Sequence, residues 1–188
     1  MALTQVETGM IKDASVTTAK LADSTVTPAK LTQPLTAGTA VASTSGTSID
    51  FTGIPSWVKR ITVMFNGVST NGGNPFLIQV GSGSVTTSGY ASSCSYQGAS
   101  TSGTNGTAGF YMWRGGAGES QSGAFTIYLV SGTTYIGSGV FGYSSAQSYS
   151  TTGGGTSPAL SGALDRIRIT TVNGTDAYDG GAINILYE

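Results

Sequence analysis

Short apolar runs separated by glycine, serine and asparagine set the strongest limit on what this chain can fold into. About nine such runs follow residue 47, at 48–54, 58–68, 75–81, 90–97, 109–113, 124–130, 134–143, 163–172 and 182–187. Apolar and polar residues alternate in several of them, which is typical of strands with one buried face. No stretch after residue 36 shows the 3.6-residue period of a helix. The pattern predicts an all-β domain, an antiparallel β-sandwich of jelly-roll-like form.

The composition of the chain narrows the classes of function. Only 9% of the 188 residues are charged and the net charge is −1, so we expect no nucleic-acid or anionic-lipid surface. No apolar run reaches the roughly 18–20 residues that span a bilayer, so no membrane insertion is predicted. Histidine is absent, which removes the commonest general base and metal ligand, and Cys94 has no cysteine partner. We therefore expect no enzyme activity, no cofactor and no metal site.

Residues 1–35 carry a ten-residue repeat, seen as VETGMIKDAS, VTTAKLADST and VTPAKLTQPL. Its apolar residues recur every five positions, at Met1, Val6, Ile11, Val16, Leu21, Val26 and Leu31. Five residues turn a helix by about 140° and alternate the faces of a strand, so no single regular element buries this stripe. Burial against identical chains around a shared axis would do so, and a homotrimeric stem is our interpretation. The alternative is a disordered polar linker.

Both ends of the chain resemble bacteriophage fibre proteins. The repeats resemble decades of tail-fibre and related virion fibre proteins, and MALTQVETGMI is similar to the MALTKV…SMI opening of phage tailspike and fibre proteins. Gln5 stands where that opening has lysine. GTDAYDGGAINILYE at 174–188 resembles the F-D-x-G-x-I-N-I-x-Y-E ending of small phage fibre β-domains, with a small departure in spacing at Gly180 and Gly181. Residues 51–72 resemble the same class of domain.

The resemblance implies a structural protein of a phage virion, assembled in the bacterial host cytoplasm. Residues 1–35 would be the virion-attachment and stem segment, bound to tail or capsid proteins, and residues 36–188 the β-sandwich head. The expected function is a tail fibre whose head binds host-surface polysaccharide. The alternative is a head fibre or capsid decoration protein without a dedicated receptor role. A depolymerase is disfavoured, because Asp176 and Asp179 are interpreted as turn residues and Glu119 as a solvated loop charge.

Sugar recognition needs aromatic faces and uncharged polar groups, but no histidine. The Gly-, Ser- and Thr-rich segments 99–109 and 144–158 are predicted to be long exposed loops. Six candidate ligand contacts lie in or near these segments: Tyr96, Tyr111, Trp113, Arg114, Tyr143 and Tyr149. Tyr111 and Trp113 could instead be core or inter-subunit residues. Arg114 could contact an acidic sugar or stack within the trimer.

Overall fold

The structure is a computed structural model that describes Leu31, residues 33–98, 101–144 and 149–188. The chain divides into two units, Met1–Pro34 and Leu35–Glu188. The predicted stem residues Met1, Val6, Ile11, Val16, Leu21 and Val26 lie outside the described residues, and Leu31 is exposed. The stem and the trimer therefore stay predictions, and the fold below is that of the second unit.

The described residues form strands and no helix, so none of them belongs to a helix that could cross a membrane. The strands are β1 (Thr36–Ala37), β2 (Val41–Ala42), β3 (Ile49–Thr52), β4 (Arg60–Thr70), β5 (Phe76–Ser82), β6 (Ser84–Val85), β7 (Ala91–Gln97), β8 (Thr101–Gly106), β9 (Phe110–Met112), β10 (Ser120–Ser131), β11 (Thr134–Ser144), β12 (Tyr149–Thr156), β13 (Arg166–Thr171) and β14 (Tyr178–Tyr187).

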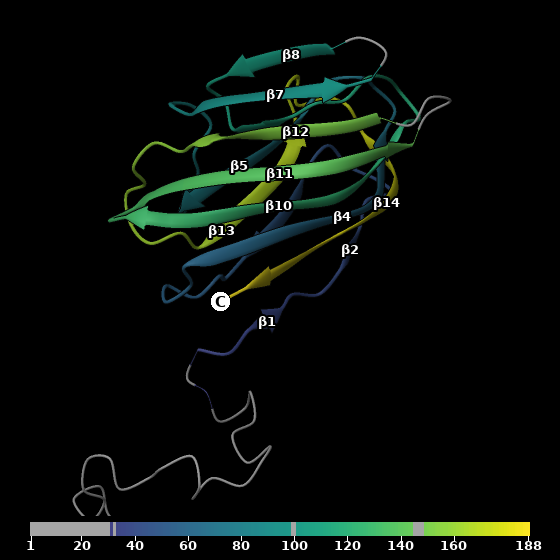
Figure 1. Cartoon of the computed structure of the whole chain (residues 1–188). Coiled ribbons are helices and arrows are strands. Elements are labelled where there is room, and N and C mark those ends of the chain that lie inside the picture. Colours follow the sequence, from purple (N-terminus) through teal and green to yellow (C-terminus); the bar gives the residue numbers. More distant parts are fainter. Residues whose placement is uncertain (1–30, 32, 99–100, 145–148) are drawn as a thin grey trace, which may run out of the picture. The chain divides into compact units, whose positions relative to one another are not determined.

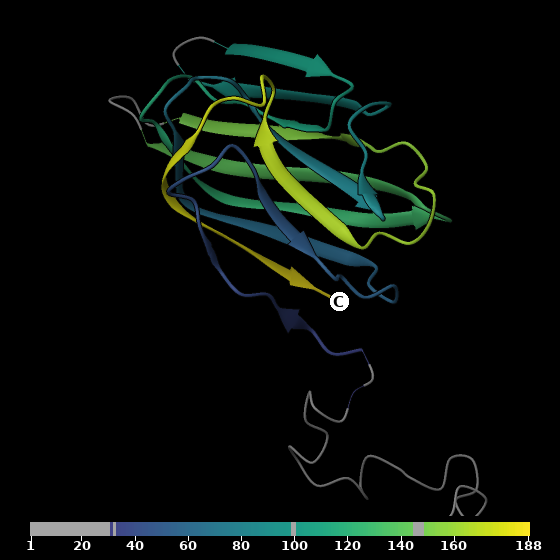
Figure 2. The ribbon, with the colours of Figure 1, turned by 180° about the vertical axis from the view of Figure 1, so that it is seen from behind.

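Two antiparallel sheets pack face to face (Figures 1 and 2). The larger sheet has the order β1-β14-β4-β10-β11-β12-β7-β8, with β2 also paired to β14. The smaller sheet has the order β3-β13-β5-β6, with β9 also paired to β5. With β1 and β2 counted as one edge strand and β6, β7, β8, β11 and β12 set aside, eight strands remain. Numbered along the chain, they lie in the order first, eighth, third, sixth in the larger sheet and second, seventh, fourth, fifth in the smaller one. This is the order of a jelly roll, so the predicted antiparallel sandwich is confirmed.

The space between the sheets is filled by apolar side chains. Val63 and Phe65 of β4 are at most 4% exposed, and the Phe65 ring contacts the rings of Phe76 in β5 and Phe141 in β11. Burying one such side chain contributes roughly 1.5–3 kcal/mol to the free energy of unfolding. The two-residue alternation in the sequence of β4 therefore marks the face of this strand that lies in the core.

Each of the nine predicted runs contains a strand, but the two predicted loops are wrong. Segment 99–109 contains β8 and segment 144–158 contains β12. The glycines of β12 are there because neighbouring backbone comes too close for a side chain: a Cβ on Gly155 would overlap the carbonyl oxygen of Ala91. Glycine thus serves close approach between strands here, where the sequence pattern indicated turns.

Because the larger sheet has more strands than the smaller one, the smaller sheet does not cover all of its inner face. Strand β9 lies at the edge of the smaller sheet and contacts β12 and β7. Beneath β7 there is a second, small apolar cluster of Leu77, Cys94 and Tyr111. Beyond this cluster, the connection from β9 to β10 covers the inner face of β11, β12 and β7.

Candidate functional site

An aromatic pocket lies on the inner face of the larger sheet, where β11 ends and β12 begins. Its volume is about 190 Å³. We define the aromatic pocket by its lining residues, which are Tyr96, Trp113, Gly115, Glu119, Tyr143, Tyr149 and Thr151.

Strand register places four of these residues opposite one another in two pairs. Tyr143 of β11 is paired with Tyr149 of β12, and Thr151 of β12 is paired with Tyr96 of β7. Directly paired residues in an antiparallel sheet project to the same face with their Cβ atoms about 4.5–5.5 Å apart. Thr151 is 1% exposed and Tyr143 6% exposed, so this face is the inner one.

The rings form a continuous series across the pocket. The ring centroid of Tyr96 lies 5.1 Å from that of Trp113 and 5.6 Å from that of Tyr149. The centroids of Tyr143 and Tyr149 lie 6.2 Å apart. Such contacts hold the rings in fixed orientations and present their faces as a preformed surface.

The connection from β9 to β10 closes the other side of the pocket. The backbone N–H of Gly115 donates a hydrogen bond of 2.8 Å to the hydroxyl of Tyr143. The buried side-chain amide of Gln121 donates to the carbonyl of Trp113, which holds the start of the connection against β10. A Cβ on Gly115 would overlap the Tyr143 hydroxyl and come within 3.0 Å of Glu119 Oε2. Glycine is thus required where this connection meets the rings.

Two oxygen atoms in the pocket have no hydrogen-bond partner among the described residues. They are Oε2 of Glu119 and Oγ1 of Thr151, and both atoms are buried. A buried polar atom without a partner costs about 1–3 kcal/mol, and more when it is charged. The prediction that Glu119 is a solvated loop charge is therefore wrong for this oxygen, which is enclosed beside aromatic rings.

Arg114 is not among the residues that line the pocket. It is 2% exposed, and its guanidinium donates to the backbone carbonyls of Thr70, Gly116 and Glu119 and to the Thr70 hydroxyl. The guanidinium also lies 5.1 Å from the centre of the Phe76 ring. Burial lowers the pKa of Arg114, and the charges of Asp179, Asp176 and Glu119 act in the opposite direction. This arrangement holds the ends of β4 and the β9–β10 connection together rather than presenting a cation to a ligand.

Tyr111 also lies elsewhere. It is 8% exposed and packs in the small cluster with Leu77 and Cys94, which agrees with the alternative that it is a packing residue. Trp113 belongs to both places, since it lines the pocket and packs against that cluster. The structure therefore gathers Tyr96, Trp113, Tyr143 and Tyr149 and separates Tyr111 and Arg114 from them.

Asp176 joins two loops to each other, and Asp179 joins β14 to β4. Asp176 Oδ2 accepts hydrogen bonds of 3.1 Å from the backbone and the side-chain amide of Asn74, and Oδ1 accepts one of 2.5 Å from Asn173. Asp179 accepts a hydrogen bond from the hydroxyl of Ser69. Asp176 lies in the loop before β14, which agrees with its interpretation as a loop and turn residue. Asp179 lies within β14, so that interpretation is wrong for Asp179.

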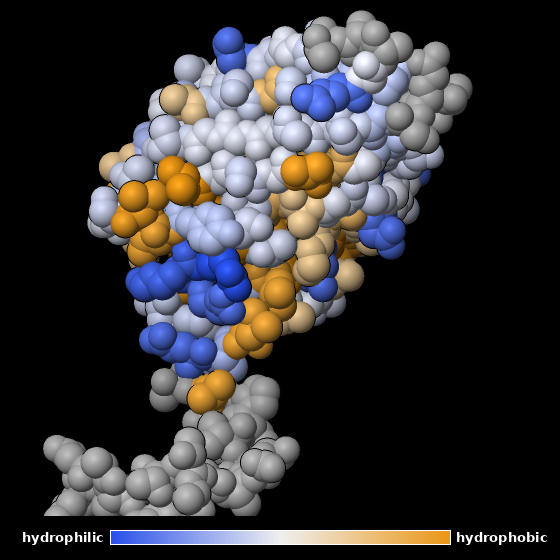
Figure 3. Space-filling view, viewed as in Figure 1, coloured by the Kyte–Doolittle hydropathy of each residue, from blue (hydrophilic) through white to orange (hydrophobic). Residues whose placement is uncertain are grey.

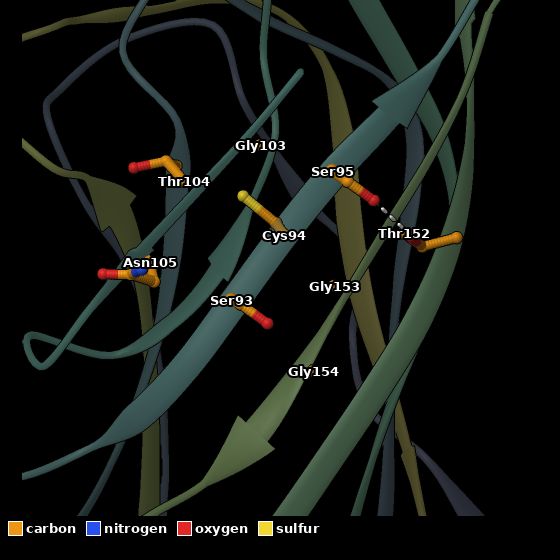
Figure 4. A pocket seen from close by; sticks show the side chains of 9 residues that line it. All are labelled: Ser93, Cys94, Ser95, Gly103, Thr104, Asn105, Thr152, Gly153 and Gly154. Atoms are coloured by element: carbon orange, nitrogen blue, oxygen red, sulfur yellow. Dashed lines mark hydrogen bonds between the residues drawn. The ribbon is translucent and has the colours of Figure 1, made fainter. Parts of the chain in front are cut away.

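A second, larger hollow of about 570 Å³ lies over β12, β7 and β8, and no sequence pattern pointed to it (Figure 4). Figure 4 shows the hydroxyls of Ser95 and Thr152 turned toward each other, and the two oxygens lie 3.1 Å apart. Cys94 points to the opposite side of β7 from Ser93 and Ser95. The residues that line this hollow are all small and uncharged: Ser93, Cys94, Ser95, Gly103, Thr104, Asn105, Thr152, Gly153 and Gly154. It has neither aromatic faces nor a charge with which to hold a ligand, so we consider the aromatic pocket the better candidate.

Within the described part of the chain, no three histidine, cysteine, aspartate or glutamate side chains are placed to hold a metal ion. Comparison of the chain with protein-family models, with curated proteins and with solved structures finds no match.

Proposed function

We propose that this chain is a structural fibre protein of a bacteriophage virion and that its β-domain binds host-surface glycan through the aromatic pocket. The observation that supports binding is the convergence of four aromatic side chains, a carboxylate and a hydroxyl on one small concavity. Aromatic rings pack against the C–H face of a sugar, while the oxygens of Glu119 and Thr151 bond its hydroxyl groups. Pockets with this mixture of apolar walls and a few convergent polar atoms are typical ligand sites.

The virion part of the proposal is supported by the sequence at both ends. The repeats and opening of residues 1–35 resemble the attachment ends of phage fibres, and residues 174–188 resemble the end of a fibre β-domain. We propose that residues 1–35 attach the protein to the phage tail and form the stem of a homotrimer. The β-domain would then face the host cell.

The outer face of the larger sheet supports self-association. Figure 3 looks onto this face and shows apolar patches among pale, weakly polar surface, with a strongly hydrophilic cluster beside them. Val140 is 61% exposed, Ile136 45% and Tyr128 40%. Arg60 is the register partner of Tyr128 and forms an ion pair with Glu188, so a second copy can pack on the apolar part of this face without leaving these charges unpaired. It supports equally a decoration protein packed into a capsid.

Binding of polysaccharide tests the glycan proposal. We expect labelled full-length protein to bind at least one member of a panel of bacterial capsular and O-antigen polysaccharides, and Tyr149→Ala to weaken that binding at least about tenfold. Tyr128→Ala is the matched control, because it removes an aromatic ring exposed on the outer face of the same sheet. Equal losses in the two variants, with folding verified by circular dichroism, would contradict the pocket as the site. Shortening of the polysaccharide during incubation would contradict a purely binding role.

The position of the protein on the particle separates the tail fibre from the head fibre. Antibody against the chain should label the tail tip region of virions in electron micrographs. Labelling of the capsid would instead support the head fibre or decoration role, and unlabelled virions would refute both.

The trimeric stem has its own test. Leu21→Asp places a charge in the five-residue apolar stripe, so sedimentation should show dissociation of the trimer, whereas Asp23→Ala leaves the stripe intact. If the two variants sediment alike, the shared-axis interpretation fails.

A further inference from the structure

We infer that the aromatic pocket selects a sugar residue that presents hydrogen-bond donors and carries no carboxylate, which is a neutral hexose or an amino sugar. This inference rests on the proposed glycan-binding function and names the class of sugar that the site takes. It is carried by the two unpartnered oxygens and by the distribution of charge around them.

The hydrogen-bonding chemistry of the pocket calls for a donor. Glu119 Oε2 is a carboxylate oxygen, which accepts hydrogen bonds, and it is buried without a partner among the described residues. Thr151 lines the same pocket, and its Oγ1 is likewise buried without a hydrogen-bond partner among the described residues. Hydroxyl or amino groups of the ligand can satisfy both oxygens, because the Thr151 hydroxyl accepts as well as donates, whereas a ligand carboxylate brings only a further acceptor to Glu119.

The charges near the pocket act against an anionic ligand. None of the residues that line it is a lysine or an arginine. Arg114 stands in the chain between the lining residues Trp113 and Gly115, but four neutral acceptor contacts hold it in the core. The carboxylates of Asp179, Asp176 and Glu119 oppose its charge. A ligand carboxylate would meet Glu119 in a partly enclosed space where charge repulsion is weakly screened.

The size of the pocket limits the contact to a single ring. Its volume of about 190 Å³ is below the range of roughly 300–1,000 Å³ typical of sites for drug-sized ligands. One sugar ring, or the end of a chain, fits this space against the faces of Trp113 and Tyr96, with the rest of the glycan outside.

Matched sugars that differ only at C6 test the inference. Calorimetric titration of the full-length protein compares the methyl glycosides of glucose and galactose with those of glucuronic and galacturonic acid, and includes glucosamine and N-acetylglucosamine. We expect the preferred neutral or amino sugar to bind at least about tenfold more tightly than its acidic counterpart. Equal or tighter binding of the uronic acid would overturn the inference while leaving the glycan-binding function intact.

A pair of charge-neutralising variants locates the source of the selectivity. Glu119→Gln keeps the shape of the side chain and removes its charge, so the preference for the neutral sugar should fall to about threefold or less. Asp50→Asn removes the same charge from an exposed carboxylate on β3, where Asp50 pairs with Arg168, and should leave the preference unchanged. An unchanged preference in Glu119→Gln would overturn the assignment of Glu119. Failure of every sugar to bind the unmodified protein would refute the proposed function, and this inference with it.

Discussion

We predict that Tyr90→Phe lowers the free energy of unfolding by about 2–3 kcal/mol at pH 7. Tyr90 is 2% exposed, and its hydroxyl accepts a hydrogen bond of 2.9 Å from the backbone N–H of Val80. The hydroxyl oxygen also lies 3.0 Å from the carbonyl of Thr86, to which it donates. Phenylalanine fills the same space as the tyrosine ring, so no large cavity forms. The loss is then that of two hydrogen bonds, with a buried N–H left unpaired.

The same variant should change how stability depends on pH. Burial raises the pKa of Tyr90 to about 12 from its ordinary value of 10.0. Because the folded pKa is the higher one, the contribution of Tyr90 is complete below pH 10 and is lost as the pH rises from 10 to 12. At pH 11 the unmodified protein should have lost about 1.4 kcal/mol through this group, a loss that Tyr90→Phe cannot show.

Urea unfolding followed by tryptophan fluorescence measures both effects. The difference in free energy of unfolding between the two proteins should be about 2–3 kcal/mol at pH 7 and about 1.4 kcal/mol smaller at pH 11. Other groups that titrate in alkali are present in both proteins, so they cancel in the difference. A difference that stays constant between the two pH values would refute the assignment of the alkaline loss to Tyr90. A difference below about 0.5 kcal/mol at pH 7 would refute the hydrogen-bond argument.

Two further predictions concern β12 and β7. Gly155→Ala should lower the free energy of unfolding by at least about 2 kcal/mol because the new methyl group overlaps the carbonyl of Ala91. Gly142→Ala, where the nearest atom would be 3.7 Å away, should change it by less than about 0.5 kcal/mol in the same thermal melts, and equal effects would contradict the close-approach argument. Cys94 is 5% exposed and burial raises the pKa of its thiol to about 11, so folded protein should resist iodoacetamide at pH 8 and react only in urea. Rapid labelling of the folded protein would show that this part of β7 opens readily.

The sequence was a good guide wherever a strand buries apolar side chains on one face. Strands β4 and β13 are visible as alternating runs because Val63, Phe65, Ile167 and Ile169 all point into one core. The sequence failed at β8 and β12, whose Gly-, Ser- and Thr-rich stretches carry almost no apolar signal. Their position is set by pairing with β7 and β11, which contributes the hydrogen bonds that the local sequence does not reveal.

At the candidate site, too, the sequence predicted some features and missed others. Tyr96, Trp113, Tyr143 and Tyr149 were singled out as aromatic residues near polar segments, and the structure brings these four together. Their role as ligand contacts stays a prediction. Nothing in the local sequence distinguishes them from Tyr111, which has the same chemistry and lies in a packing cluster. The contribution of Glu119 could not be read either, because its burial depends on strands far away in the chain.

The sequence by itself determined the class of fold, because a two-residue hydrophobic period is a local property that each strand carries within its own few residues. The tertiary structure alone decided which glycine-rich segments join the sheet and which aromatic rings meet. Those outcomes depend on register between strands that are distant in sequence, and a shift of one residue turns every side chain to the other face. The pairs Tyr143–Tyr149 and Tyr96–Thr151 exist only in the register that the whole sandwich selects.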